Sequence, residues 1–367
     1  MTKRFAAAIL ALIVSISPAG AQSKAWDILR EIVLVPGVSG HEGLVSHAIQ
    51  GRLPAALKAE RDVMNNVWFT IGSGRPHILF VAHLDELGWV VDKITPEGRV
   101  RVKPGGGILP QTVEARPVLI HTGRGDVPGI VPPRPDYDER QPPSSVALET
   151  PAAAEGFDIF LGVATEAEAR ALGVTEGDTV TAKKSFVDFA PGLMATRAVD
   201  DRAGCAALLD AAVRLKPGMV KGRTVTFAWD VQEETGLFGA AELSKTLKPD
   251  YVFAIDTFVS TDSPLESKRF AFLPVGGGAV VRAIDSSNVT PKTEIRKVLA
   301  LAKKRGIPVQ VGNSRGGNDG SVFLAGGAVD IPLSWPGSYA HSLIEKIDRR
   351  DLEALTDLIL ALVEDWK

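Results

Sequence analysis

Short apolar runs that end in acidic or histidine-containing motifs are the feature that most constrains this chain. Residues 78–82 and 251–255 have the length and composition of buried strands, and polar residues follow each run directly. Ligands of open α/β sheets bind beyond the carboxyl ends of the strands. We therefore expect an α/β sheet with these polar groups at one edge. In chain order the motifs are His83-Leu-Asp85-Glu86, Asp200-Asp201-Arg202, Gln232-Glu233-Glu234, Ile255-Asp256-Thr257 and Ala340-His341-Ser342.

Helical and strand patterns alternate along most of the chain. Apolar spacing predicts helices at residues 26–34, 42–53, 204–215, 238–245, 293–304 and 351–364. Strands are expected at residues 78–82, 87–91, 223–230 and 250–256. This alternation predicts an α/β fold with a central mixed sheet flanked by helices.

The composition changes between residues 95 and 190. Proline and glycine are frequent there, the strands look short, and residues 165–172 have the pattern of a short helix. We interpret this stretch as a small β-rich domain inserted into the larger one. The predicted division assigns residues 22–94 and 191–367 to the main domain and residues 95–190 to the insertion.

The first 21 residues have the pattern of a cleavable secretory signal peptide. Lys3 and Arg4 precede a nearly unbroken apolar run at residues 5–16, and Ala19-Gly20-Ala21 offers a small-residue cleavage site. The alternative reading is an N-terminal anchor, but the run is too short to span a bilayer. We therefore expect cleavage after Ala21, a periplasmic or secreted protein, and no stable membrane insertion.

Charge and cysteine content exclude several other classes of site. A net charge of −3 gives no electrostatic reason to expect nucleic-acid binding. The only cysteine, Cys205, lies in an apolar stretch and is interpreted as a small core residue. Neither an internal disulfide nor a cysteine-based zinc site can form. A metal site in this chain would have to use histidines and carboxylates.

The motifs differ in how much each one says alone. His83 could bind a metal while Asp85 orients its ring, although a hydrogen-bonded loop histidine is the simpler reading. One aspartate of Asp200-Asp201 could cap the following helix, but two buried carboxylates call for a cation. Glu233 and Glu234 could be a solvated pair, yet their flanks are apolar or small.

Two adjacent carboxylates at a strand end can divide their work. One can hold a metal while the other accepts a proton from water. Asp256 and His341 are weak signals by themselves. Two histidines and several carboxylates brought together form the nitrogen- and oxygen-rich site that divalent transition metals prefer. The ordered set therefore predicts a metallohydrolase.

Together the motifs resemble the M42 family of glutamyl aminopeptidases and tetrahedral aminopeptidases, within the wider clan of two-zinc exopeptidases. Order and spacing agree from about residue 30 to the C-terminus. The matching stretches are residues 82–88, 199–204, 231–240, 316–320 and 340–342. The resemblance implies a catalytic α/β domain that is interrupted by a small β-barrel domain similar to a PDZ module.

The resemblance also implies a ligand set for two divalent metal ions. Asp200 would bridge them, His83 and Asp256 would complete the ligands of one ion, and Glu234 and His341 those of the other. Zinc is the expected metal, with cobalt or manganese as alternatives, since the same ligands accept all three.

The implied activity is metal-dependent hydrolysis of N-terminal residues from peptide substrates. Glu233 would be the general base, and Asp85 would support His83. The alternatives are a metal-dependent deacylase of N-acyl amino acids, which uses similar ligands, and a binding protein on a peptidase scaffold that has lost its activity. Members of the family are typically cytosolic and often form hollow tetrahedral particles, so a homo-oligomer is one expectation for this chain.

Overall fold

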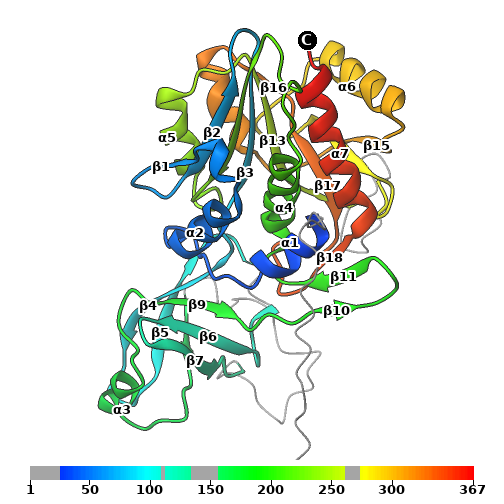
Figure 1. The fold of residues 1–367 in the computed structure, drawn as a ribbon. Helices are drawn as coiled ribbons and strands as arrows, with labels where there is room; N and C mark the ends of the chain where they lie inside the picture. Colours follow the sequence, from blue (N-terminus) through cyan, green and yellow to red (C-terminus); the bar gives the residue numbers. More distant parts are fainter. Residues whose placement is uncertain (1–24, 109–111, 134–155, 261–272) are drawn as a thin grey trace, which may run out of the picture.

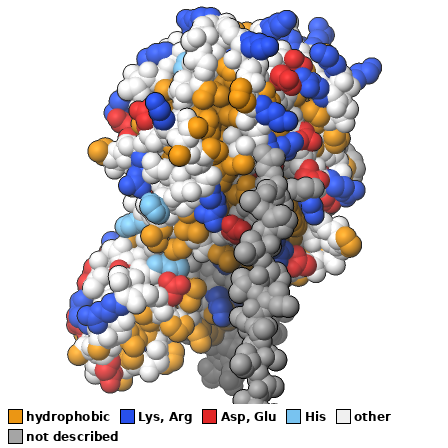
Figure 2. Space-filling view, in the orientation of Figure 1, with side chains coloured by type: hydrophobic (Ala, Val, Ile, Leu, Met, Phe, Trp, Pro, Cys, Tyr) orange, Lys and Arg blue, Asp and Glu red, His pale blue; other side chains and the backbone are white. Residues whose placement is uncertain are grey.

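The computed structural model describes residues 25–108, 112–133, 156–260 and 273–367. The predicted signal peptide at residues 1–21 lies outside these ranges. Figure 1 shows a larger α/β part above a smaller β-rich part. On the face drawn in Figure 2, acidic and basic side chains are interspersed over both parts. Of the helices in the described ranges, none has the length and hydropathy needed to cross a bilayer.

A nine-stranded mixed sheet forms the centre of the α/β part, which confirms the predicted architecture (Figure 1). The strand order is β1-β2-β12-β3-β13-β17-β14-β15, and β16 pairs with β13. The four inner strands β12, β3, β13 and β17 are parallel, whereas β2 and β14 run antiparallel to them. The strands are β1 (Glu60–Arg61), β2 (Val67–Gly72), β3 (His77–His83), β12 (Thr224–Asp230), β13 (Tyr251–Val259), β14 (Ala279–Ile284), β15 (Val309–Asn313), β16 (Val329–Asp330) and β17 (Leu333–Gly337).

Helical elements cover both faces of this sheet. In β3, Ile78 and Phe80 pack into the core on the side of α1, α4 and α7, while Leu79 and Val81 pack with residues of α5 and η5. Successive side chains of a strand point to opposite faces, so a strand covered on both faces must be apolar throughout. The helical elements are α1 (Ala25–Ile32), α2 (Gly43–Arg52), η1 (Ala55–Leu57), α4 (Val199–Val213), α5 (Phe238–Thr246), α6 (Lys292–Arg305), η5 (Asp319–Gly326) and α7 (Arg349–Asp365).

The β-rich part is a six-stranded antiparallel sheet in the order β7-β6-β9-β4-β5-β8. Ile130 of the edge strand β7 and Phe160, the residue after the other edge strand β8, are joined by two backbone hydrogen bonds (3.0 and 2.9 Å). The likeness to a PDZ module stays a prediction. The elements are β4 (Gly88–Ile94), β5 (Val100–Gly105), β6 (Pro117–Thr122), β7 (Gly125–Ile130), β8 (Phe157–Ile159), α3 (Glu166–Ala171) and β9 (Thr179–Ala182).

The pairing of β4 differs from the predicted division of the chain. Residues 88–94 were assigned to the main domain, but β4 pairs with β5 and β9 in the six-stranded sheet. The side chain of Trp89 is buried in the separate core of that sheet. A third, three-stranded sheet of β10 (Val187–Asp188), β11 (Leu193–Thr196) and β18 (Glu345–Asp348) lies where the chain returns to the α/β part. The division into two domains stays a prediction.

A buried charge cluster holds the chain where β3 leads into β4. The carboxylate of Glu86 is fully buried and lies 2.8 Å from Lys184 Nζ, 2.8 Å from Arg197 Nη2 and 3.8 Å from Arg202 Nη2. Arg202 also donates to the carbonyl of Leu84 (2.8 Å), and Arg197 to that of Leu87 (3.0 Å).

These charges decide the ionisation of Glu86. Burial alone would raise its pKa, but Lys184, Arg197 and Arg202 outweigh burial and lower the pKa to about 2. Burial lowers the pKa of Lys184 to about 7, so the two guanidinium groups keep Glu86 ionised where Lys184 is neutral. The cluster fixes the backbone between β3 and β4, next to His83 and Asp85.

The variant Glu86→Gln should unfold more easily than the wild type by about 3 kcal/mol at neutral pH, since it leaves buried cations without their anion. The folded-state pKa lies below the ordinary value of 4.5, so the stabilisation is complete above that value and is lost as the pH falls toward 2. Urea unfolding from pH 7 to 3 should show the difference shrinking by about 1.4 kcal/mol per unit below pH 4.5.

The control is Glu166→Gln, which removes an exposed pair with Arg170 on α3. It should change stability by less than about 0.5 kcal/mol. A difference between Glu86→Gln and wild type that does not vary with pH would contradict the charge argument.

Candidate metal centre and active site

The carboxyl ends of the parallel strands bring the predicted site residues together. His83 is the last residue of β3, and Asp256 lies level with it on the neighbouring strand β13, because Ile255 pairs with Ala82. Glu233 and Glu234 follow β12 on the other side of β3. These elements and the turn after β17 line a cavity of about 950 Å³.

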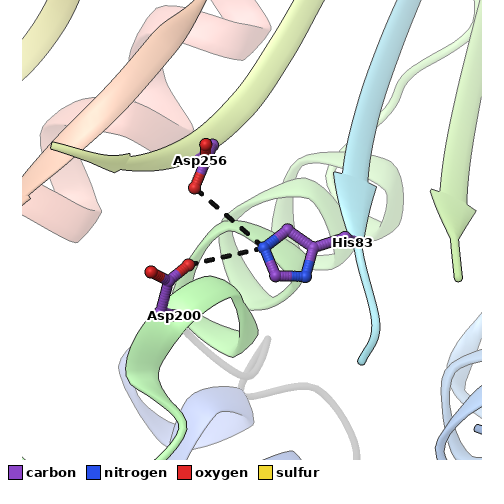
Figure 3. Close-up of side chains that lie close together, drawn as sticks. All are labelled: His83, Asp200 and Asp256. Atoms are coloured by element: carbon purple, nitrogen blue, oxygen red, sulfur yellow. Dashed lines mark ion pairs between the residues drawn. The ribbon is translucent and has the colours of Figure 1, made fainter. Parts of the chain in front are cut away.

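The first group, which we call the His83 cluster, contains His83, Asp200 and Asp256. Figure 3 shows the three side chains converging from β3, α4 and β13. His83 Nε2 lies 3.4 Å from Asp200 Oδ1 and 4.0 Å from Asp256 Oδ1. One potential ligand atom of each residue lies within 4.8 Å of the others.

The second group, the His341 cluster, contains Asp200, Glu234 and His341. His341 Nε2 lies 3.8 Å from Asp200 Oδ2 and 3.6 Å from Glu234 Oε2. The Nδ1 atom of His341 donates a hydrogen bond to the carbonyl of Gly107 (3.1 Å). The lone pair of the other ring nitrogen, Nε2, is then directed at the cluster. The two oxygens of Asp200 thus face different clusters.

The chemistry of these side chains fits divalent cations. Burial and the charge of Asp200 raise the pKa of Glu234, and burial raises the pKa of Asp256 against the effect of Arg282. Asp200 Oδ1 and Glu234 Oε1 are buried and have no hydrogen-bond partner among the described residues. Several carboxylates buried this close together destabilise the folded chain unless a positive charge compensates them. Imidazole and carboxylate ligands suit zinc, cobalt and manganese alike.

Asp85 supports more of the site than the sequence indicated. Its Oδ1 atom lies 3.4 Å from His83 Nδ1, as a residue that orients the ring should. It also accepts hydrogen bonds from the backbone amides of Glu233 (3.0 Å) and Glu234 (3.2 Å) and from Ser39 Oγ (2.6 Å). One buried carboxylate therefore ties the end of β3 to the loop after β12.

Glu233 lines the same cavity as the two clusters. Burial raises its pKa, and the charge of Asp319 acts in the same direction. A carboxylate with a raised pKa is a stronger base once it is ionised. Its position and environment suit a proton acceptor beside the two clusters.

Sequence reasoning missed Arg282, a buried residue of β14. Its Nη2 lies 2.9 Å from Asp256 Oδ2, and it donates to Ser334 Oγ (2.8 Å) and to the carbonyl of Gly317 (2.7 Å). The signal was an arginine inside an apolar strand pattern, since a buried guanidinium needs an anion. Arg282 leaves Asp256 Oδ1 for the His83 cluster.

Asp201, the neighbour of Asp200, does not join either cluster. It accepts hydrogen bonds from Trp335 Nε1 (3.2 Å) and from the amide of Gly204 (3.1 Å). A Cβ atom at Gly204 would lie 2.4 Å from both carboxylate oxygens of Asp201, so only glycine fits there. Of the two aspartates, Asp200 thus belongs to both clusters, whereas Asp201 makes its hydrogen bonds within the protein at the start of α4.

Comparison with known proteins agrees with this geometry. A sequence model of the M42 glutamyl aminopeptidases matches residues 65–358. The chain belongs to the M42 glutamyl aminopeptidase family. It is therefore an aminopeptidase, a hydrolase, and a member of a metal-dependent family, which confirms the predicted class of enzyme.

Curated relatives of this M42 family member differ in the substrate residue that their names specify. The chain is 28% identical to a lysyl aminopeptidase of Pyrococcus furiosus, over 93% of this chain and 97% of the relative. It is also 28% identical to a glutamyl aminopeptidase of Lactococcus lactis, over 86% and 89%. Family membership thus leaves the preferred N-terminal residue open.

A solved structure shows the same fold. The TET1 peptidase of Pyrococcus horikoshii, which can assemble into a tetrahedron or a large octahedral shell, is 33% identical to this M42 family member. The TM-score is 0.83, and the match covers 93% of this chain and 100% of the peptidase.

Removal of metal should lower the melting temperature of this M42 family member, and addition of Zn²⁺ or Co²⁺ should restore it, because the ions bind only the folded site. Metal at about 100 times its dissociation constant corresponds to about 2.7 kcal/mol per site. The variant Glu234→Gln should melt at or above the wild type without metal, since it removes a carboxyl group whose ionised form is disfavoured at this position, and should gain less from added metal. Differential scanning calorimetry measures both effects.

The control Glu242→Gln alters an exposed pair with Lys245 on α5 and should respond to metal as the wild type does. Equal melting of wild type with and without metal would argue against a preformed centre. A Glu234→Gln response equal to that of the wild type would remove Glu234 from the ligand set.

Proposed function

We propose that this chain is an exported two-metal aminopeptidase with Glu233 as the general base. The observation that carries the proposal is the position of Asp200, whose two oxygens face a histidine in each of two clusters. His83 and Asp256 would hold one ion with Asp200, and Glu234 and His341 the other. When bound, such ions lower the pKa of water and polarise the scissile carbonyl group.

The side chains of the protein would supply proton transfer and orientation. Glu233 would accept the proton of the attacking water and pass it to the leaving amine. Asp85 would keep Glu233 in place through its backbone amide and keep the His83 ring oriented. The free amino terminus of a peptide could bind one of the two ions through its nitrogen. A substrate with a blocked amino terminus lacks that free amine.

The experiment is hydrolysis of dipeptides and aminoacyl anilides, each free and N-acetylated, after chelation and metal addition. We expect metal-restored cleavage of the free-amine set alone. Glu233→Gln should retain its metal but lower kcat by about 10²- to 10⁴-fold, the usual contribution of a general base. Glu242→Gln should keep the wild-type rate.

Each other outcome has a definite meaning. Cleavage of only the acetylated set would move the protein to the deacylases with the same metal centre. A near-wild-type rate for Glu233→Gln would remove Glu233 as the base. Two bound metals with no cleavage of either set would favour a binding protein on a peptidase scaffold.

Export and assembly complete the proposal. The leader pattern at residues 1–21 supports a periplasmic or secreted protein, and the likeness to a TET1 peptidase supports a homo-oligomer. Mass spectrometry of the protein recovered from an expressing bacterial host should find a mature chain that begins at Gln22 in the periplasm or the medium. Its native mass should be a multiple of the chain mass. A full-length chain retained in the cytoplasm would contradict export, and a monomer would contradict assembly.

A further inference from the structure

Glu345, the first residue of β18, has a pattern of contacts that neither the motifs nor the mechanism account for. Its side chain is buried, with 4% exposed. Oε2 accepts hydrogen bonds from the amides of Val199 (2.6 Å) and Asp200 (3.1 Å). Oε1 accepts from the amide of His341 (3.0 Å). The same carboxylate thus holds the backbone of two members of the His341 cluster.

The backbone at both places needs an external partner. Ala198 (φ 59°) and His341 (φ 61°) are left-handed although neither is glycine, which costs roughly 1–2 kcal/mol per residue. Ala198 precedes α4 and supplies no side-chain cap to the helix. The first amides of a helix have no partner within the helix. Glu345, in β18, supplies that partner.

We propose that Glu345 is a positioning residue that sets the distance between Asp200 and His341 and thereby builds the ion site of the His341 cluster. The inference rests on the proposed two-metal function. Asp200 belongs to both clusters, but His341 and its turn belong only to the second. Loss of Glu345 should therefore weaken the His341 cluster more than the His83 cluster, where Arg282 and Asp85 hold Asp256 and His83.

The test is titration of metal-free full-length protein with Co²⁺, followed by calorimetry and by the visible absorption of the bound ion. The wild type should bind two ions per chain. Glu345→Gln places an amide NH₂ group against backbone N–H donors. This variant should lower the affinity for the second ion by about 10- to 100-fold, the usual cost of losing a residue that orients metal ligands. The spectrum at the second equivalent should change, while that at the first should stay close to wild type.

Asp351→Asn is the matched control. Asp351 is also buried, and its two oxygens accept the amides of Gly276 (2.6 Å) and Gly278 (2.7 Å) on a segment that contains neither cluster. This variant should lose stability but bind both ions as the wild type does. Glu345→Asp keeps the carboxyl group on a shorter side chain and should fall between Glu345→Gln and the wild type, so it tests the inference if Glu345→Gln does not fold.

The outcomes separate the two proposals. If the wild type binds two ions and cleaves free-amine substrates while both Glu345 variants bind the second ion with unchanged affinity, the positioning role is wrong and the proposed function stands. If the wild type never binds two ions, the proposed function itself fails. Equal losses in Asp351→Asn and Glu345→Gln would mean that the effect reports general stability, which would also overturn the inference.

Discussion

The rest of this structure depends on the carboxylate of Asp200, which is shared between two histidines. Its oxygens lie 3.4 Å from His83 Nε2 and 3.8 Å from His341 Nε2, so one residue couples the end of β3 to the turn after β17. Around it are the largely buried carboxylates of Glu234 and Asp256, whose pKa values are raised by loss of solvent. Burial of so much like charge opposes folding unless cations are present. The fold and the metal are therefore linked in free energy as well as in geometry.

Further buried carboxylates hold the backbone instead of facing the cavity. Asp85 accepts hydrogen bonds from the backbone amides of Glu233 and Glu234. Glu345 accepts hydrogen bonds from those of Asp200 and His341. A site that holds an ion tolerates little error in position, so fixing the main chain of the cluster residues is as important as supplying their side chains. Burial opposes ionisation of Asp85, but contact with His83 outweighs it and lowers the pKa, so Asp85 also adds negative charge to the site. That charge strengthens the preference of the site for divalent cations over a neutral occupant.

Much of the fold could be predicted because its signals are local. The apolar run at residues 78–82 is a strand buried on both faces, and the helix at residues 293–304 is present as α6. The sheet to which residues 88–94 belong could not be predicted in the same way. Residues 88–94 look like a strand in either part, and only pairing with β5 and β9 assigns them to the six-stranded sheet. Strand partners depend on contacts that a local pattern does not contain.

The site divides along the same line. Its polar residues are predictable where they follow the end of a strand, as at His83. Arg282 and Glu345 instead act through partners in other elements. Glu345 accepts a hydrogen bond from the backbone amide of Asp200, which lies 145 residues away in the sequence. Substrate preference belongs with this second kind of residue. A lysyl and a glutamyl aminopeptidase are each 28% identical to this chain, although their names refer to side chains of opposite charge. The resemblance to the family rests on motifs at the strand ends, whereas the cavity is also lined by loop residues such as Ser314 and Tyr339. Loops vary more freely than buried strands do, so selectivity can change while the chemistry stays the same.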